Sequence, residues 1–179
     1  MTAAEMLSVA AFNEGRHAQA FPTFGSERTG APVVAFCRWD DRPIRLREPV
    51  TDPDAVIVQD PTLLHQVKLF AGLEIGGFLL VNTSREPGDL GLGDLVHELS
   101  SAHAVTVPAT EIARECLGRP LPNAALLGAF SALTGEVSLE AVCGAIRSRF
   151  PGEVGEGNVS AAQVAHEHVR RSLGRLADA

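Results

Sequence analysis

Three short apolar runs, each followed by a helical pattern, constrain the fold of this chain more than any other feature. The runs are AVIV at residues 55–58, FLLV at residues 78–81 and AVTV at residues 104–107. Short, largely apolar runs rich in β-branched residues are typical of strands buried on both faces of a parallel sheet. A segment with helical character follows each of them, at residues 61–70, 92–101 and 110–117. This alternation predicts βαβ units, with helices over both faces of the sheet.

After Pro120 the pattern changes to helices without intervening strands. A polar residue that can accept hydrogen bonds from the first N–H groups of a helix stands near the start of each one. These residues are Asn123 for residues 124–133, Ser138 for a run to Phe150, and Asn158 for a last helix to Leu176. The expected fold is therefore an α/β, Rossmann-like, mostly parallel sheet with helices on both faces and a helical C-terminal third.

The N-terminal part adds a helix and a hairpin to this scheme. The run TAAEMLSVAAFNEG, which starts at Thr2, predicts a helix that Gly15 ends. Residues 32–39 have the character of a strand, and the Asp-Asp pair at 40–41 predicts a turn into a second strand at residues 43–46. No repeat or low-complexity stretch divides the chain, so we expect one domain over all 179 residues.

An arginine-dense zone stands out in an otherwise acidic chain. Residues 16–47 hold six arginines and three acidic residues, a local balance of +3. The whole chain has a net charge of −7, which leaves −10 for the remainder. A basic segment on an acidic body favours a site for anions or for an acidic partner. The overall charge argues against a dedicated nucleic-acid binder, whose footprint is normally basic.

Composition and cysteine spacing limit the other classes of protein. No run approaches the roughly 18 apolar residues that span a bilayer, and no signal-peptide pattern precedes the first helix, so we expect a cytoplasmic protein without membrane contact. The three cysteines, Cys37, Cys116 and Cys143, lie far apart and form no CxxC pair. We expect reduced, packed thiols and no metal site.

Polar clusters follow the three buried strands. They read QDPT at residues 59–62, NTSR at 82–85 and PATE at 108–111. The carboxyl ends of parallel strands are where open α/β sheets bind ligands, and such side chains can bind through amides, hydroxyls and helix-start N–H groups. The alternative is structural: Thr62 and Thr110 are helix caps. Because no Ser–His–Asp or Cys–His pairing, Walker A motif or complete GxGxxG motif is present, we expect no complete catalytic centre.

Six motifs resemble the gamma subunit of 2-oxoacid:ferredoxin oxidoreductases of the pyruvate synthase type. They are AFPTFGSERTGAPVVAF, DDRPIR, DAVIVQDPTLL, LLVNTS, TVPATEIA and RPLPNAALLGAF. The resemblance runs in the same order and at similar spacing from Thr2 to about Asn158, which is nearly the whole chain. A single motif of this kind is weak, whereas six in register are specific.

This resemblance implies a non-catalytic subunit. Enzymes of this group decarboxylate a 2-oxoacid with thiamine diphosphate and Mg, pass electrons through iron–sulfur clusters to ferredoxin, and deliver the acyl group to coenzyme A (CoA). The resemblance places the thiamine site between the alpha and beta subunits and the clusters in the beta and delta subunits. It implies that this chain alone binds none of these cofactors. Its implied role is structural, close to the CoA site, with the alpha, beta and delta subunits as partners.

Two of the motifs carry the implied site residues. Matching positions are Ser26, Glu27, Arg28 and Thr29 in the FGSERTGAP loop, and Asn82, Thr83 and Ser84 at the strand end. The resemblance implies that these residues line the intersubunit face and contact a cofactor there. Arg28 can bind a diphosphate or a carboxylate through two N–H groups, or pair with Glu27 inside the loop.

The chain departs from the family pattern at its start. Family members begin with a short strand and a GRGGQG-type turn before the TAAEML-type helix, whereas this chain begins at the helix. We hypothesise a misassigned start codon, which the upstream DNA would test. A chain of this length would leave one sheet edge for a partner to cover, and would weaken any claim of phosphate binding.

Two other functions stay open from the sequence alone. One is a subunit of an indolepyruvate- or 2-oxoglutarate-type enzyme with the same architecture. The other is a stand-alone α/β enzyme that binds a small phosphorylated ligand at the strand ends. A stand-alone enzyme predicts a stable monomer with a defined pocket, whereas a subunit predicts an exposed surface that binds a partner.

Overall fold

A computed structural model describes residues 2–23, 33–65, 69–99 and 103–177. Its centre is a parallel sheet of three strands in the order β3-β4-β5: β3 (Ala55–Val58), β4 (Phe78–Asn82) and β5 (Ala104–Val107). All three strands predicted from the apolar runs are confirmed. Val58 pairs with Val81, and Asn82 pairs with Val107, so the carboxyl ends of the strands meet at one edge.

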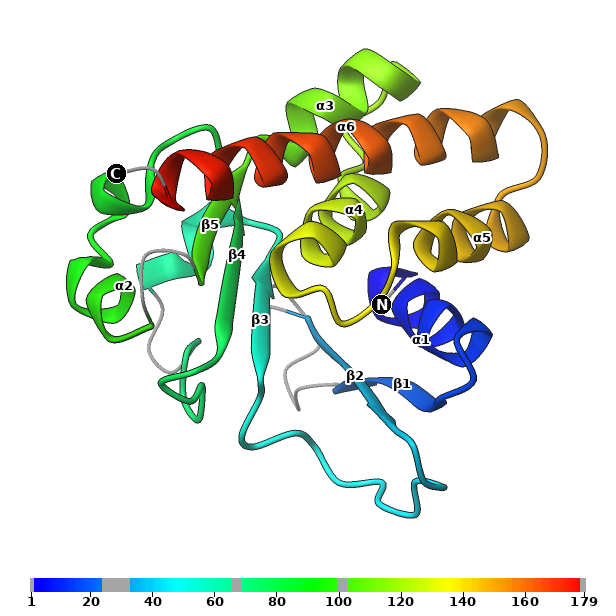
Figure 1. Cartoon of the computed structure of the whole chain (residues 1–179), viewed down its shortest axis with the longest axis horizontal. Coiled ribbons are helices and arrows are strands. Elements are labelled where there is room, and N and C mark those ends of the chain that lie inside the picture. The colour runs from blue at the N-terminus through cyan, green and yellow to red at the C-terminus, as the bar shows by residue number, and fades with distance from the viewer. Residues whose placement is uncertain (1, 24–32, 66–68, 100–102, 178–179) are drawn as a thin grey trace.

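A separate antiparallel pair lies on the β3 side of this sheet (Figure 1). It consists of β1 (His17–Thr23) and β2 (Val34–Asp40), which are in register from His17 opposite Asp40 to Thr23 opposite Val34. The second hairpin strand predicted at residues 43–46 is wrong, because this segment forms no strand and the partner of β2 precedes it in the chain. Pro43 has no N–H group to donate to a strand ladder.

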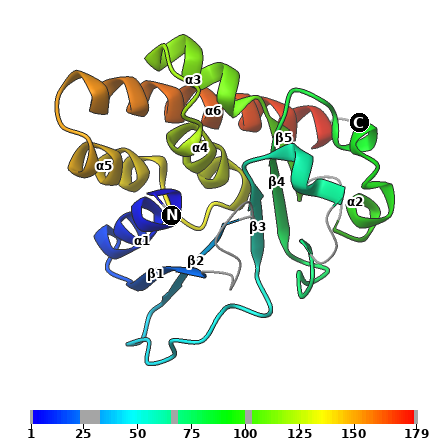
Figure 2. The same ribbon diagram turned by 180° about the vertical axis from the view of Figure 1, so that it is seen from behind.

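Helices cover both faces of the parallel sheet, as predicted (Figures 1 and 2). Leu80 of β4 packs into the larger core, whereas its neighbours Leu79 and Val81 pack into the smaller one on the opposite face. The larger core is built with α1 (Thr2–Asn13), α3 (Ala109–Leu117), α4 (Asn123–Thr134), α5 (Leu139–Arg149) and α6 (Glu153–Ala177). The smaller core involves the 3-10 helices η1 (Pro61–His65) and η2 (Pro87–Leu90) and the helix α2 (Gly93–Leu99).

The helices α4 and α6 approach each other backbone to backbone. Both helices carry fully buried alanines, and a Cβ atom added to Gly128 would lie 1.9 Å from the carbonyl oxygen of Ala162. Small side chains let the two helices pack this closely. The contact fixes α6, the longest helix, across the rest of the helical layer (Figure 1).

Helix ends follow the sequence prediction only in part. Ser138 caps α5, since its hydroxyl accepts a hydrogen bond from Ala141 N at 3.1 Å, and Gly15 ends the first helical segment with a φ of 86°. Asn123 does not cap α4, and Asn158 lies inside α6, where its amide donates to Val154 O. The helix predicted at residues 61–70 is a 3-10 helix, Pro61–His65, in its described part.

The cysteines are free thiols, as predicted. Cys143 is buried, Cys37 and Cys116 are half-buried, and burial raises the pKa of Cys37 to about 12. In the described ranges, no helix has both the length and the apolar character needed to cross a bilayer.

Candidate functional site

The carboxyl ends of β3, β4 and β5 form a pocket of about 370 Å³. This is the edge at which the sequence predicts a ligand, and each of the three polar clusters contributes to its wall. The lining residues are Gln59, Asp60, Pro61, Asn82, Thr83, Ser84, Pro108, Thr110 and Glu111. The structure therefore brings Asn82, Thr83 and Ser84 together with segments more than twenty residues away on either side.

Asn82 lines the pocket and is only 7% exposed. Its Nδ2 donates to Gln59 O and to Thr110 Oγ1, both at 2.8 Å. Its Oδ1 accepts a hydrogen bond from Thr110 N at 3.1 Å. Because both amide hydrogens are used inside the chain, Asn82 joins the ends of β3 and β4 to the first turn of α3 and positions the pocket wall.

Gln59 extends this network to the helical layer. Its Nε2 donates to Asn123 Oδ1 at 2.8 Å, and Pro122, not Asn123, is the N-cap residue of α4. Thr110 likewise is not a cap. Pro108 is the N-cap residue of α3, and the Thr110 hydroxyl accepts a hydrogen bond from the Asn82 amide. The Gln59–Asn123 bond joins residues 64 positions apart, and no local sequence signal predicts it.

Thr83 and Ser84 form the rim of the pocket. The backbone N–H of Thr83 donates to Val107 O at 3.0 Å, and its hydroxyl accepts from Arg85 N at 3.2 Å. Ser84 is exposed, and its hydroxyl makes no hydrogen bond with any described residue. Among the matched strand-end residues, Ser84 therefore has the side chain that is free to bind another molecule.

The pocket carries negative charge. Asp60 accepts hydrogen bonds from the hydroxyl and the backbone N–H of Thr62, at 2.7 and 2.9 Å, and these bonds hold the pKa of its carboxyl below the ordinary value. Glu111 adds a second carboxyl group, and no Lys or Arg is among the described lining residues. Such a pocket favours hydrogen-bond donors and cations over phosphate.

The other predicted site residues, Ser26, Glu27, Arg28 and Thr29, lie outside the described residues. Their implied role stays a prediction. The described part of the chain also contains no group of three or more His, Cys, Asp or Glu side chains that could hold a metal ion. The cofactor contact implied for Asn82, Thr83 and Ser84 likewise stays a prediction.

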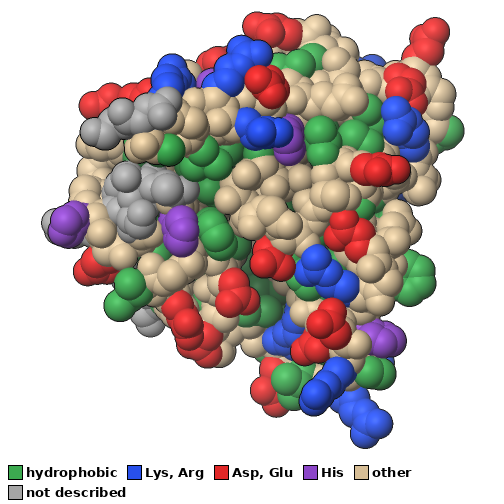
Figure 3. All heavy atoms as spheres, in the orientation of Figure 1, with side chains coloured by type: hydrophobic (Ala, Val, Ile, Leu, Met, Phe, Trp, Pro, Cys, Tyr) green, Lys and Arg blue, Asp and Glu red, His purple; other side chains and the backbone are tan. Residues whose placement is uncertain are grey.

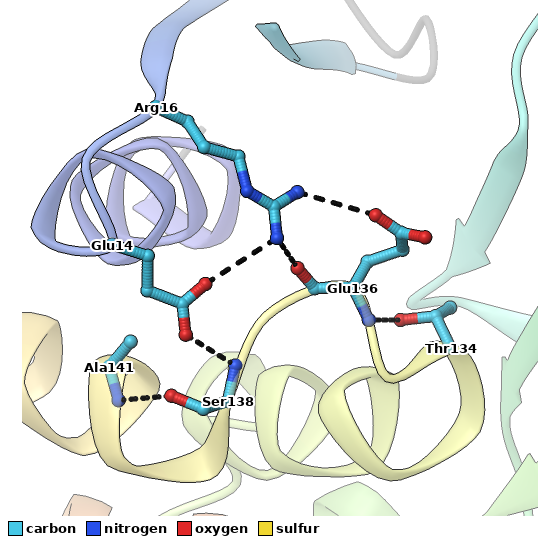
Figure 4. Close-up of polar contacts among 6 residues, drawn as sticks. All are labelled: Glu14, Arg16, Thr134, Glu136, Ser138 and Ala141. Carbon is cyan, nitrogen blue, oxygen red and sulfur yellow. Dashed lines mark hydrogen bonds and ion pairs between the residues drawn. The ribbon is translucent and has the colours of Figure 1, made fainter. Parts of the chain in front are cut away.

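Arg16, the first arginine of the basic zone, is occupied by a structural contact (Figure 4). It pairs with Glu136 Oε2 at 3.3 Å and Glu14 Oε2 at 3.6 Å, and it donates to the carbonyl oxygen of Glu136. Glu14 in turn accepts from Ser138 N at 2.9 Å. This cluster joins the start of β1 to the turn between α4 and α5, so Arg16 is not available to an anion.

These features define a class: an open α/β domain with a polar pocket at the carboxyl edge of its parallel sheet, where such folds meet their ligands. Comparison with known families then identifies the particular group. The chain belongs to the pyruvate ferredoxin/flavodoxin oxidoreductase family, whose match covers residues 1–168.

Individual relatives agree with this assignment. The chain is 46% identical to pyruvate synthase subunit PorC of Methanothermobacter thermautotrophicus, over 96% of this chain and 89% of that one. It is 47% identical to the gamma subunit common to the pyruvate/ketoisovalerate oxidoreductases of Thermococcus litoralis, over 93% of this chain and 89% of that subunit. The resemblance to gamma subunits that the sequence motifs indicate is thereby confirmed.

Solved structures extend the agreement to the fold. The pyruvate oxidoreductase subunit PORC of Thermotoga maritima matches with a TM-score of 0.74 and 38% identity, over 93% of this chain and 87% of that one. The gamma subunit of a keto/oxoacid ferredoxin oxidoreductase of Geobacter sulfurreducens matches with a TM-score of 0.67 and 27% identity, over 95% of this chain and 90% of that one. The predicted fold class is confirmed.

Proposed function

We propose that the chain is the gamma subunit of a 2-oxoacid:ferredoxin oxidoreductase of the pyruvate synthase type. The observation that carries this proposal is the family match over residues 1–168, together with 46% identity to a PorC subunit along almost the whole chain. The pocket supports it, because its described residues form a binding surface without a nucleophile and base in contact.

In the proposed complex, a 2-oxoacid, CoA and two oxidised ferredoxins give acyl-CoA, CO2, two reduced ferredoxins and a proton. Thiamine diphosphate with Mg supplies the decarboxylation chemistry, and iron–sulfur clusters carry the electrons one at a time. We assign these cofactors to the alpha, beta and delta subunits, as the resemblance to gamma subunits implies. The complex works in the cytoplasm.

The contribution of this chain is to bind and position. Asn82 holds three strand and helix ends in place, and Ser84 and Glu111 present free polar groups at the edge of the sheet. If CoA passes this edge, the two carboxyl groups favour its amide and hydroxyl groups over its phosphates. We propose that its phosphates are bound elsewhere, with Arg28 as the candidate.

We propose that the other subunits select the 2-oxoacid. The Thermococcus relative is named as a subunit common to pyruvate and ketoisovalerate oxidoreductases, so one gamma subunit is compatible with two substrates in that organism. Pyruvate is our first choice here, because the PorC relatives carry that name. Indolepyruvate and 2-oxoglutarate are the alternatives to test.

An anaerobic pull-down of the tagged chain from its native host tests the proposal. We expect larger thiamine- and cluster-containing chains to co-purify, with CoA-dependent reduction of a viologen dye by pyruvate. Reduction by another 2-oxoacid alone would identify one of the alternative enzymes. A chain that elutes without partners would contradict the subunit role and favour the stand-alone α/β enzyme.

A further inference from the structure

A ten-residue segment with the sequence DRPIRLREPV projects from the body of the protein. This arm (residues 41–50) leaves the end of β2 and leads toward the start of β3, so it lies at the opposite end of the parallel sheet from the pocket. In Figure 1 the chain between these two strands runs along the lower margin, away from the helical layer. Eight of its ten residues are exposed, the exceptions being Ile44 and Val50.

The backbone of the arm is only loosely tied to the rest of the chain. Gln19 Nε2 donates to Ile44 O at 3.1 Å, and Arg38 Nη2 donates to Glu48 O at 3.2 Å. Between these two points, the N–H groups of residues 45–47 donate to no described residue. An exposed segment with unused N–H groups can pair with a strand of another molecule once it adopts an extended conformation.

The side chains of the arm are also unpaired. Arg42, Arg45 and Arg47 are exposed and form no ion pair or hydrogen bond through their guanidinium groups in the described structure. Leu46, between two of them, is 59% exposed. Figure 3 shows cationic side chains at the lower tip of the molecule, where Figure 1 places the arm. Asp41 and Glu48 flank this basic stretch.

We propose that the arm is a docking strand for an acidic, extended segment of another subunit of the complex. This inference rests on the proposed function. In an extended chain Arg45 and Arg47 point to the same side, roughly 7 Å apart, and Leu46 points to the other. A partner strand with carboxylates at alternate positions pairs with both arginines while its backbone bonds to the free N–H groups, which is recognition by strand addition.

The charges favour another subunit over a second copy of this chain. Each copy has a net charge of −7, so two copies repel one another at long range. A small anion is a poorer match, because the unpaired arginines are distributed over residues 42–47 of the chain. A strand with carboxylates at alternate positions matches the spacing of Arg45 and Arg47.

The test compares the assembled complex with the free chain by hydrogen–deuterium exchange. We expect the amides of residues 44–48 to exchange at least about tenfold more slowly in the complex, since they become hydrogen-bonded. The double variant Arg45→Glu/Arg47→Glu should assemble at least about tenfold more weakly, and the loss should shrink at high salt. Arg119→Glu/Arg170→Glu is the matched control, because both residues are exposed and carry no ion pair in the described structure.

The outcomes separate this inference from the proposed function. Failure of the unmodified chain to co-purify with any subunit contradicts the gamma-subunit role itself. Normal assembly without slower exchange in the arm overturns the docking strand alone, as does equal weakening by both double variants. Self-association of the free chain that Arg45→Glu/Arg47→Glu abolishes would make a second copy the occupant and also overturn it. Unchanged unfolding midpoints confirm that the variants keep their fold.

Discussion

Asn82 illustrates, at the scale of single residues, how a side chain in a predicted binding motif also serves the fold. The resemblance to gamma subunits implies a role in cofactor contact, and the structure places Asn82 in the wall of the pocket. Its amide is nevertheless committed to Gln59 and Thr110. We therefore regard Asn82 as a positioning residue and Ser84 as its neighbour that is free to contact a partner.

Substitution of Asn82 tests this division of roles. Asn82→Ala removes the three hydrogen bonds that the buried amide makes with Gln59 and Thr110, so we expect the free energy of unfolding to fall by about 2 kcal/mol. Ser84→Ala, on the exposed rim, should change it by less than about 0.5 kcal/mol. Urea denaturation of both variants measures the difference. Equal effects would show that the Asn82 network does not stabilise the strand ends.

Cys37 provides a second prediction for a single residue. Burial raises the pKa of its thiol to about 12, so only about one molecule in ten thousand carries the reactive thiolate at pH 8. We expect Cys37 to resist a thiol reagent such as DTNB in the folded protein and to react after unfolding in guanidinium chloride. Peptide mass mapping identifies the modified cysteine. Rapid labelling of Cys37 in the native state would contradict the raised pKa of its thiol.

At the scale of elements, the contact between α4 and α6 depends on one glycine. A methyl group at Gly128 would collide with the backbone of Ala162, which cannot rotate away. We expect Gly128→Ala to lower the free energy of unfolding by about 3 kcal/mol or more, because the helices must separate.

Gly174 in the exposed end of α6 is the matched control. A Cβ atom there meets nothing within 4 Å, and alanine has the better helix propensity. We expect Gly174→Ala to raise the free energy of unfolding by about 0.5 kcal/mol. Thermal and urea unfolding of both variants measure whether each substitution lowers or raises the free energy of unfolding. A neutral Gly128→Ala would mean that the helices can move apart at little cost.

The helix α6 also predicts a dependence of stability on pH. Burial, together with neighbouring arginines, lowers the pKa of His166 and His168 in the folded protein below the ordinary 6.5. The unfolded chain therefore binds these protons more readily, and stability falls as the pH drops through and below 6.5. Glu167 opposes the shift at His166, and Glu86 opposes it at His168.

We expect the melting temperature to be lower at pH 5.5 than at pH 7.5. The double variant His166→Gln/His168→Gln should reduce this difference, because glutamine does not titrate. His17→Gln, at an exposed position at the start of β1, is the control and should leave the difference unchanged. An identical pH dependence in the wild type and the α6 variant would rule out these two histidines as its source.

At the scale of the whole molecule, the polar cluster around Arg16 ties the N-terminal segment to the helical layer (Figure 4). Arg16 also lies over the ring of Trp39 at 5.9 Å, so it joins β2 as well. The Arg16 side chain is only 25% exposed, and its partner Glu136 lies 120 positions further along the chain. Loss of these contacts weakens the attachment of the start of β1 to the turn between α4 and α5.

Arg16→Ala should lower the free energy of unfolding by about 1–2 kcal/mol and speed proteolysis near the start of β1. Arg147→Ala removes the more exposed ion pair with Glu156 and should lower the free energy of unfolding by less than Arg16→Ala does. Limited proteolysis with urea denaturation compares the two. A larger loss at Arg147 would contradict the special role of the Arg16 cluster.

The parts of the fold predictable from sequence are those fixed by local patterns. The buried strands β3, β4 and β5 are apolar enough to be recognised alone, and the Ser138 cap follows from its position before a helix. The pairing of β1 with β2 was not predictable, because it depends on contacts of both strands with the core. Asn123 and Asn158 resemble caps, yet Asn123 accepts from the distant Gln59, and Asn158 lies inside α6 and donates to Val154 O of the same helix.

For this protein, the sequence by itself determined the βαβ order, the edge of the sheet where polar side chains gather, and the family. Tertiary structure alone decided that Asn82 is occupied, that the pocket is negative rather than a phosphate cradle, and which arginines are free. Arg16 is paired, whereas Arg42, Arg45 and Arg47 are not. The physical reason is that charge and hydrogen bonding act between groups brought together in space, whatever their separation along the chain.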